Sequence, residues 1–497
     1  MGGFQNLPML NIYRAGLLPP AQMPRLRRLL QETAMAASQL PLPTLSSLAR
    51  DLAAGTTTSR KLVEDCLARI HAPEGEGARA FVSVAAEQAL QAADAMDLLR
   101  QAGAAPSPFA GIPLAIKDLF DIRGEVTTAG SKVLANQPPA QDDAVAVARL
   151  RAAGFIFIGR VNMTEFAYSG LGMNPHYGTP RSPYERMPGE PEQGRVSGGS
   201  TSGGAVAVAD GMAHGALGTD TGGSCRIPAA FCGIVGFKPT ARRVPAQGAL
   251  PLSTSLDSIG PLARSVQCCA TLDAILADET PVEVNPLAVA GLRLGILSTI
   301  ALDALDPQVA RQFEATVEAL EDAGAIVSRI EIPALLDIAT MNAKGGYTAA
   351  ESYAWHRTWI ETQAQAYDPR VLVRMSRGQE QSAADYINLH PQRSAIIAGF
   401  EAAVAGLDAV IFPTAAIVPP RIADLGTEML PDGDAAYTAA NLLALRNATL
   451  INTVDGCAVS LPIGPAGGPP VGLTIAGPAG SDHHILAVAA GIEARLA

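Results

Sequence analysis

The chain has 497 residues and a formal net charge of −11, and 48% of its residues are hydrophobic while only 17% are charged. This length is sufficient to bury a large core, and the scattered Gly and Pro residues exclude collagen and low-complexity disorder. The acidic balance argues against a nucleic-acid partner, because binding to the phosphate backbone needs clustered Lys and Arg.

The sequence also restricts the cellular setting. No segment approaches the roughly 18 to 20 consecutive apolar residues of a membrane-spanning helix. The first thirty residues carry several arginines and lack the apolar stretch of a signal peptide. The six cysteines form no CxxC pair, which indicates reduced core thiols rather than disulfides or zinc ligands. We therefore expect a cytoplasmic protein without membrane association, metal or organic cofactor.

The chain begins with a segment that we expect to lie outside the main fold. Residues 1–43 contain one helical candidate, Pro24–Leu40, between two proline-rich breaks. Two helical patterns follow, the second over Lys61–Ile70, where apolar residues recur at helical spacing. An alanine-rich helix is predicted over Ser83–Ala102.

Further along, helices and short apolar strands alternate. The predicted helices are Asp143–Ala153, Gly204–Asp210 and Pro307–Ala323. The predicted strands are Phe155–Gly159, Ala213–Gly218, Leu292–Leu297, Ile326–Ile332 and Ala409–Phe412. Such alternation indicates an α/β/α sandwich, a sheet covered by helices on both faces. No internal repeat and no Gly/Ser linker is visible, so we expect residues 44–497 to form one large domain.

Residues 340–400 read as helices and loops and hold both tryptophans of the chain, Trp355 and Trp359. Either this region is a helical cap with its aromatic rings packed in the core, or some of the rings wall a substrate pocket. The two tryptophans lie four positions apart and would share one face of a helix. Phe166 and Tyr168 are likewise open between core packing and the pocket wall.

Two segments are rich in glycine and serine. Residues 197–204 read SGGSTSGG, and residues 218–224 read GTDTGGS. Glycines around a serine let backbone N–H groups approach a ligand. The chain has no G-x-x-x-x-G-K-[ST], no G-x-G-x-x-G and no serine within G-x-S-x-G. Nucleotide binding and the nucleophile elbow of α/β-hydrolases therefore lose support.

A serine hydrolase still needs a base, and the seven histidines fall in no shared motif. Only five of the 36 basic residues are lysines, and one of them, Lys117, ends the apolar strand candidate GIPLAIK. Burial disfavours the charged ammonium and lowers its pKa, so that a buried lysine can accept a proton near neutral pH.

These segments belong to a longer series of motifs that extends through the chain. The series includes GIPLAIKD with Lys117, GRVNMTEFA at 159–167, NPHYGTPR at 174–181, the loop 197–204, GTDTGGSCRIPAAFCGIVGFKPT at 218–240, LDSIGP at 256–261, DGCAVSLP at 455–462 and PVGLTIAG at 470–477. In content and order it resembles the amidase signature family of serine amidohydrolases, over roughly residues 44–497.

The resemblance implies an α/β fold with a mixed central sheet and a Ser-cisSer-Lys catalytic triad. In this sequence it assigns the base to Lys117, the bridging serine after a cis peptide bond to Ser200, and the nucleophile to Ser224. The expected chemistry passes through a covalent acyl-serine. The N–H groups expected to surround the oxyanion are those of Thr221, Gly222, Gly223 and Ser224.

Three neighbouring residues are expected to support this triad. Asp220 and Arg226 flank the nucleophile, and the resemblance implies that they pair to fix its loop, although Arg226 could instead bind a substrate carboxylate. Ser202 either satisfies a turn hydrogen bond or assists Ser200.

The resemblance thus implies a hydrolase of carboxamides or related C–N acyl bonds that acts on a small-molecule amide or carbamate. Two alternatives stay open. One is a carbamate (urethane), biuret or allophanate-type hydrolase, and the other is the amidase chain of a glutamine-dependent tRNA amidotransferase. The sequence does not fix the substrate or the need for a partner chain, and it allows for a homodimer.

Overall fold

A computed structural model describes residues 42–186, 193–426, 435–465 and 467–496. Residues Thr44–Ala497 form one compact unit. The helix expected at Pro24–Leu40, and with it nearly all of the expected extension 1–43, lies outside the described residues.

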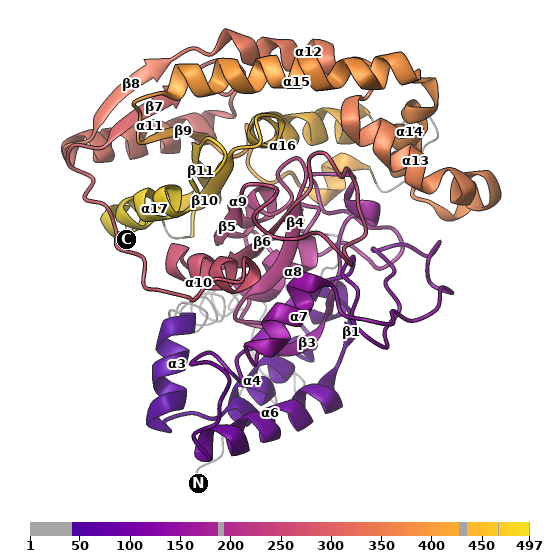
Figure 1. The fold of residues 1–497 in the computed structure, drawn as a ribbon, viewed down its shortest axis with the longest axis vertical. Helices are drawn as coiled ribbons and strands as arrows, with labels where there is room; N and C mark the ends of the chain where they lie inside the picture. The colour runs from indigo at the N-terminus through magenta and orange to yellow at the C-terminus, as the bar shows by residue number, and fades with distance from the viewer. Residues whose placement is uncertain (1–41, 187–192, 427–434, 466, 497) are drawn as a thin grey trace, which may run out of the picture. The chain divides into compact units, whose positions relative to one another are not determined.

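Eleven strands in the described residues form one mixed sheet, in the order β1-β3-β2-β4-β6-β5-β10-β11-β9-β7-β8 (Figure 1). The strands are β1 (Phe81–Val84), β2 (Pro113–Lys117), β3 (Ile156–Val161), β4 (Ala216–Asp220), β5 (Val235–Lys238), β6 (Ser258–Ala263), β7 (Arg293–Leu297), β8 (Ile326–Ile330), β9 (Ala409–Pro413), β10 (Cys457–Ile463) and β11 (Val471–Gly477). β2 runs parallel to β3 and β4, and β7 runs parallel to β8 and β9. All other neighbours in this sheet are antiparallel.

Helices connect most of these strands, and polar caps fix where several of them begin. The helices are α3 (Leu45–Ala54), α4 (Ser59–Ile70), α5 (Gly77–Ala80), α6 (Ala86–Gln101), α7 (Val145–Ala152), α8 (Ser202–Ala209), α9 (Arg226–Cys232), α10 (Val266–Leu276), α11 (Pro307–Asp322), α12 (Asp337–Met341), α13 (Gly346–Gln363), α14 (Pro369–Ser376), α15 (Ala383–Val404), α16 (Ala435–Thr453) and α17 (Asp482–Leu496). Thr44 caps α3 by accepting the N–H of Ser47. Ser382 and Asp385 form a capping box that starts α15.

The two faces of the sheet bury different hydrophobic clusters. In β2, Leu114 and Ile116 pack in the cluster that contains residues of α3, α7, α10 and α17. Ala115 packs in the cluster with residues of α4, α6 and α8. Because side chains alternate along a strand, Lys117 belongs to the same face as Ala115. The mixed sheet with helices on both faces confirms the predicted α/β/α sandwich.

The predicted elements agree with the structure to within about three residues at their ends, with two exceptions. The alanine-rich helix begins at Ala86 and not at Ser83, because Phe81–Val84 is a short edge strand that pairs with β3. Strands β5, β6, β10 and β11 were not predicted. Gly and Pro interrupt the alternation in these strands, as in SIGPLA of β6 and CAVSLPI of β10.

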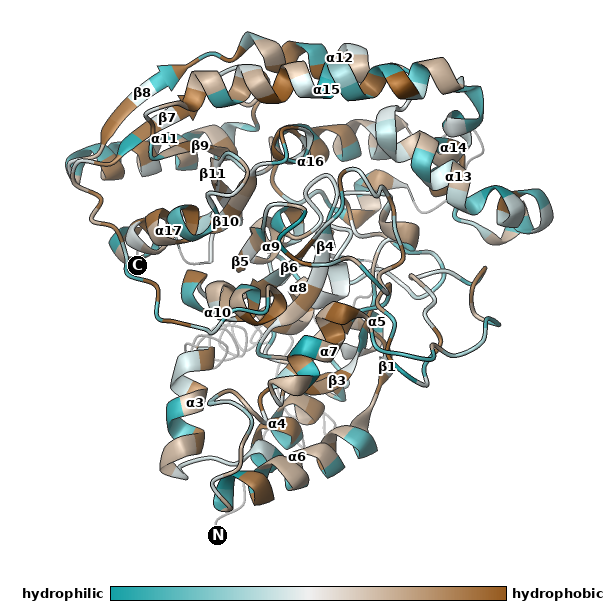
Figure 2. Ribbon diagram, viewed as in Figure 1, coloured by the Kyte–Doolittle hydropathy of each residue, from teal (hydrophilic) through white to brown (hydrophobic). Residues whose placement is uncertain are grey.

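Residues 340–400 are mainly helical, as the sequence indicated, and contain α13, α14 and most of α15. Along α15, hydrophobic and hydrophilic residues lie side by side (Figure 2). Its buried residues Ile396 and Phe400 join a cluster with residues of β9 and α16. None of the helices in the described part of the chain combines the length and apolar character that a membrane crossing requires.

The packing of α15 gives a test of the fold. A Cβ added at Gly399 would lie 2.5 Å from the Cβ of Ala334, in the 3₁₀ turn Pro333–Leu336. We expect Gly399→Ala to lower the free energy of unfolding by about 1 to 3 kcal/mol through overpacking, although Ala favours helix by about 1 kcal/mol over Gly. Urea denaturation measures this change.

The matched control is the double variant Gly399→Ala, Ala334→Gly, which restores the room between the two segments. It should regain part of the lost stability. If Gly399→Ala alone is as stable as the parent protein, the close approach of α15 to this turn is wrong.

Candidate active site

Lys117 lies at the carboxyl end of β2, completely buried. Its Nζ lies 2.8 Å from the Oγ of Ser200 and 2.8 Å from the Oγ1 of Thr219. Burial lowers the pKa of this lysine to about 8, although the charge of Asp220 acts in the opposite direction. A lysine with this pKa loses its proton within reach of neutral pH.

Ser200 sits in the loop that leads into α8, and its side chain is fully buried. The Gly199–Ser200 peptide bond is cis, as the resemblance implied. The Ser200 carbonyl accepts the N–H of Thr164 at 3.1 Å. A Cβ at Gly199 would lie 2.6 Å from the backbone nitrogen of Gly172, so two loops meet here at backbone distance.

Ser224 follows β4 at the end of the loop that begins at Thr221, and it is 3% exposed. Its carbonyl accepts the N–H of Thr201 at 3.3 Å, which joins this loop to the loop of Ser200. The Oγ of Ser224 makes no hydrogen bond to another described residue. The structure thus brings Lys117 and Ser200 into hydrogen-bond contact and connects Ser224 to them through the backbone.

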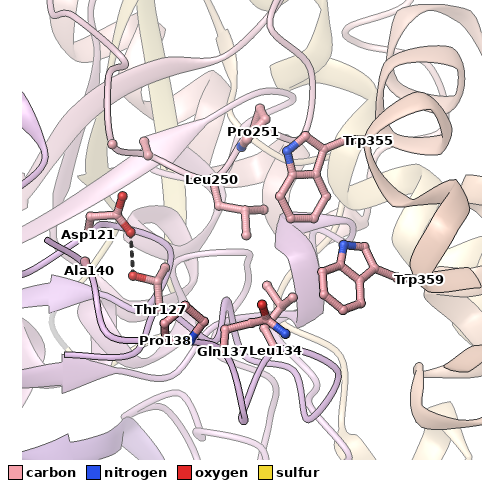
Figure 3. A pocket seen from close by; sticks show the side chains of 12 residues that line it. Asp121, Thr127, Leu134, Gln137, Pro138, Ala140, Leu250, Pro251, Trp355 and Trp359 are labelled. Carbon is pink, nitrogen blue, oxygen red and sulfur yellow. Dashed lines mark hydrogen bonds between the residues drawn. The ribbon is translucent and has the colours of Figure 1, made fainter.

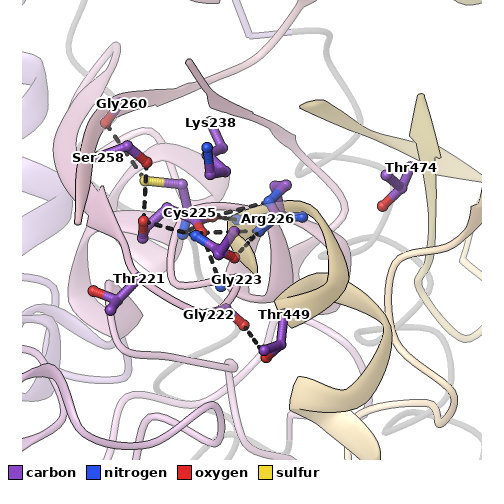
Figure 4. A network of polar contacts seen from close by, with 12 residues as sticks. Thr221, Gly222, Gly223, Cys225, Arg226, Lys238, Ser258, Gly260, Thr449 and Thr474 are labelled. Carbon is purple, nitrogen blue, oxygen red and sulfur yellow. Dashed lines mark hydrogen bonds and ion pairs between the residues drawn. The ribbon is translucent and has the colours of Figure 1, made fainter. Parts of the chain in front are cut away.

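The carboxylate of Asp220 organises the loop from inside (Figure 4). It accepts the N–H of Gly223 at 2.8 Å and that of Cys225 at 3.1 Å. Arg226 forms two hydrogen bonds to it, at 3.0 and 2.9 Å, and also donates to the Oδ1 of Asn452 at 2.7 Å. Burial alone would raise the pKa of Asp220, but the guanidinium of Arg226 holds it well below its usual range. With both side chains fully buried, Arg226 pairs with Asp220 rather than facing a substrate.

The contact to Asp220 corrects one expectation about the oxyanion loop. The N–H of Gly223 points at the Asp220 carboxylate and is therefore occupied. The N–H groups of Thr221, Gly222 and Ser224 have no hydrogen-bond partner in the described part of the chain. Gly223 serves the loop through its backbone shape, because its φ of 120° suits only glycine and an added Cβ would lie 2.5 Å from Ala448.

Ser202 is the first residue of α8, and its Oγ donates to the carbonyl of Asn162 at 3.4 Å. Its hydrogen bond therefore goes to a neighbouring loop and not to Ser200. Cys225 is fully buried, and burial raises the pKa of its thiol well above the usual value. Neither side chain is placed to take part in proton transfer with Lys117.

The four aromatic candidates fall into two places. Phe166 is 1% exposed and packs against His356, with ring centroids 4.2 Å apart. Tyr168 contacts Arg374, whose guanidinium lies 5.6 Å from the tyrosine ring. Trp355 and Trp359 line a separate cavity of about 460 Å³ together with residues 121, 127, 134 and 248–251 (Figure 3). Lys117, Ser200 and Ser224 are not among the residues that line this cavity.

Sequence reasoning missed two residues that hold the site. Thr219 contacts Lys117, and its position one residue before Asp220 in β4 was a usable signal, because parallel β2 and β4 end at the same edge. Asn452 donates to the carbonyl and carboxylate of Asp220 at 3.0 and 2.9 Å. No local pattern indicates Asn452, because 232 positions separate it from its partner.

Within the described residues, no group of three or more His, Cys, Asp or Glu side chains is arranged to hold a metal ion. The expectation that the protein needs no cofactor stays a prediction.

Comparisons with known proteins agree with these motifs. The sequence model of the amidase family matches residues 61–486. The 2-amino-5-chloromuconic acid deaminase of Comamonas testosteroni is 36% identical over 446 residues, which cover 88% of this chain and 92% of that protein. The A chain type of the glutamyl-tRNA(Gln) amidotransferase from Chromohalobacter salexigens is 35% identical over 485 residues, covering 90% and 95%. A crystal structure of an amidase has a TM-score of 0.81 and 32% identity, covering 92% of this chain and all of that one.

The chain therefore belongs to the amidase family. It is a hydrolase of carbon–nitrogen bonds other than peptide bonds, in agreement with the sequence analysis.

Proposed function

We propose that this amidase cleaves a small amide through a covalent acyl-serine, with Lys117 as base, Ser200 as relay and Ser224 as nucleophile. The observation that supports this most is the buried Lys117 amine 2.8 Å from the Ser200 Oγ. A lysine serves as a base only when neutral, and burial favours that form.

The proton path follows from this contact. Neutral Lys117 accepts the proton of Ser200 as Ser200 takes the proton of Ser224, so the Ser224 oxygen becomes nucleophilic as it attacks the carbonyl. The proton then returns to the leaving nitrogen, which an amide cannot expel unprotonated. The Ser224 Oγ would complete this relay by turning toward Ser200, since catalytic hydrogen bonds often form only with substrate bound.

The N–H groups of Thr221, Gly222 and Ser224 are proposed to stabilise the oxyanion. They have no other partner in the described residues, and the Asp220–Arg226 pair holds their loop in shape. Donors fixed in advance stabilise the developing charge without reorganising during the reaction. Water then hydrolyses the acyl-serine and frees the acid.

The proposed substrate is a small amide or carbamate. A urethane, biuret or allophanate-type substrate stays a candidate, because the site geometry addresses the acyl carbon and not the group beyond the nitrogen. The proposal keeps the expected cytoplasmic location and allows for a homodimer, which light scattering after size-exclusion chromatography tests.

The first experiment is labelling of the purified protein with a fluorophosphonate. We expect one equivalent to attach to Ser224, as located by peptide mass spectrometry, and none to attach in Ser224→Ala. Hydrolysis of an amide, anilide, ester and carbamate panel should disappear in the same variant. An unlabelled parent protein that is inert toward the whole panel would refute the proposed function.

The second prediction concerns Lys117. Because its pKa is about 8, kcat/KM for an uncharged amide should rise about tenfold per pH unit below pH 8 and level off above it. Lys117→Met should reduce turnover by several orders of magnitude, since base assistance is worth about 10²- to 10⁴-fold and the triad acts as a unit. Lys61→Met, which changes an exposed lysine, is the control. A folded Lys117→Met variant with near-parental activity would disprove the assignment.

A third prediction addresses Trp355 and Trp359. If their cavity receives part of the substrate, Trp355→Ala should change the ranking of substrates by acyl-group size while leaving the labelling of Ser224 intact. A wall contact is worth about 1 to 3 kcal/mol between substrates that differ by a methylene. Trp355 is 40% exposed, so its loss should change the melting temperature little. Unchanged relative rates in stable variants of both tryptophans would exclude this cavity from the substrate site.

The amidotransferase alternative is supported by the similarity to one chain of that enzyme. It predicts that glutamine is hydrolysed only after partner chains are added. Robust activity of the chain alone on small amides would remove it.

A further inference from the structure

Two carboxylates, Asp257 and Glu351, hold one turn between them, and this turn touches the oxyanion loop. The turn comprises residues 252–257 and directly precedes β6. Asp257 belongs to the turn itself, whereas Glu351 comes from α13 in the helical region. Neither residue was singled out by the sequence analysis, and the proposed mechanism uses neither of them.

Asp257 joins the turn to Thr221. Its Oδ1 accepts the hydroxyl of Thr221 at 2.5 Å. Its Oδ2 accepts the N–H groups of Leu252 and Ser253 at 3.0 and 3.1 Å. Burial raises the pKa of this carboxyl to about 6, while these three hydrogen bonds favour its charged form.

Glu351 holds the other side of the same turn. Its Oε2 accepts the hydroxyl of Ser253 at 2.6 Å and the N–H of Ser255 at 3.1 Å. Its Oε1 accepts the hydroxyls of Ser255 and of Tyr386 in α15, at 2.5 and 2.8 Å. Four donors thus converge on one carboxylate, and no basic side chain of the described residues forms an ion pair with it.

Ser253 is the shared element of the two carboxylates. Its backbone N–H goes to Asp257 and its hydroxyl goes to Glu351, so it cannot move without loosening both contacts. Arg393 of α15 adds a further restraint by donating to the carbonyl of Ser255 at 2.8 Å. The turn is therefore held by the helical region on one side and holds Thr221 on the other.

Thr221 depends on this outer support because the anchors of its loop lie mainly on the other side. The inner side is fixed by Asp220, through the N–H groups of Gly223 and Cys225. In the described part of the chain, the side chain of Thr221 forms its one hydrogen bond with Asp257. The direction of the Thr221 N–H is therefore set by the turn as well as by Asp220.

We propose that Glu351 and Asp257 are positioning residues of the amidase reaction, which aim the Thr221 end of the oxyanion loop from helix α13 through the turn 252–257. The inference rests on the proposed acyl-serine mechanism and adds to it a defined role for the helical region. Positioned donors lose much of their effect when they shift, because the full loss of one oxyanion donor costs about 10²- to 10³-fold in kcat.

The cavity beside the turn makes this link relevant to substrate binding. Glu351, Trp355 and Trp359 follow at intervals of four residues and share one face of α13. Leu250 and Pro251 line the same cavity as the tryptophans and directly precede the turn. A group bound in the cavity would contact both partners of the Glu351–turn junction.

The test measures the labelling of Ser224 by a fluorophosphonate and separates the binding constant KI from the rate constant of bond formation, kinact. Glu351→Gln removes the negative charge and two acceptor sites at nearly constant size. We expect kinact to fall about tenfold with KI and the melting temperature little changed. Glu361→Gln, an exposed glutamate on the same helix, is the matched control and should behave as the parent protein.

A rescue series shows whether the effect passes through Thr221. Thr221→Val removes the hydroxyl at nearly constant shape and should lower kinact to a similar extent, whereas Thr221→Ser keeps the hydroxyl and should restore it. The double variant Glu351→Gln, Thr221→Val should be no slower than Thr221→Val, because the connection is already broken.

The outcomes separate this inference from the proposed function. A parent protein that is not labelled at all refutes the mechanism itself. A labelled parent together with a Glu351→Gln variant of parental kinact, or multiplicative losses in the double variant, refutes the positioning role. If Glu351→Gln does not fold, Ser253→Ala, which removes one hydroxyl from the same junction, must show the loss of kinact for the inference to stand.

Discussion

The buried amine of Lys117 is the constraint on which the rest of the site depends. An ammonium without hydration must be paired with a carboxylate or must become easier to deprotonate. The carboxylate whose charge acts most on it, Asp220, is already bound by Arg226 and Asn452. Lys117 is thus left with the hydroxyls of Ser200 and Thr219, and its pKa falls to about 8. The Asp220–Arg226 pair therefore does two things: it shapes the loop of Ser224, and it keeps Asp220 from holding Lys117 in its charged form.

This arrangement requires loops to meet at backbone distance around the lysine. An added Cβ at Gly172 would lie 2.2 Å from the carbonyl of Gly198, and one at Gly198 would lie 2.9 Å from the Cα of Pro228. Side chains at these positions would separate the Ser200 loop from α9 and from the loop before it. The glycine-rich segments visible in the sequence thus have a packing reason, besides giving N–H groups access to a substrate.

The sequence predicted the parts of the molecule that carry local signals. Lys117 was found because a rare lysine ends an apolar strand, and most helices were found from spacing and caps. Strands such as β6 and β10 escaped because Gly and Pro break their alternation. Glu351 escaped because its partners in the turn lie 96 to 98 positions away, and nothing in its own helix marks it. The occupied N–H of Gly223 also could not be foreseen, because a motif does not show which neighbouring carboxylate accepts which donor.

The helical region is attached to the catalytic part on both sides of the site, and this decides what kind of element it is. On one side, Glu165 accepts the N–H of Asp368 at 2.6 Å, and Phe166 packs against the buried His356. On the other side, Glu351 holds the turn next to Asp257. A lid that opens by a hinge would have to break buried hydrogen bonds to carboxylates at both places, and such bonds are among the stronger ones in proteins. The region is therefore built as a fixed wall, and a change of substrate size is accommodated by its side chains rather than by movement of the whole region.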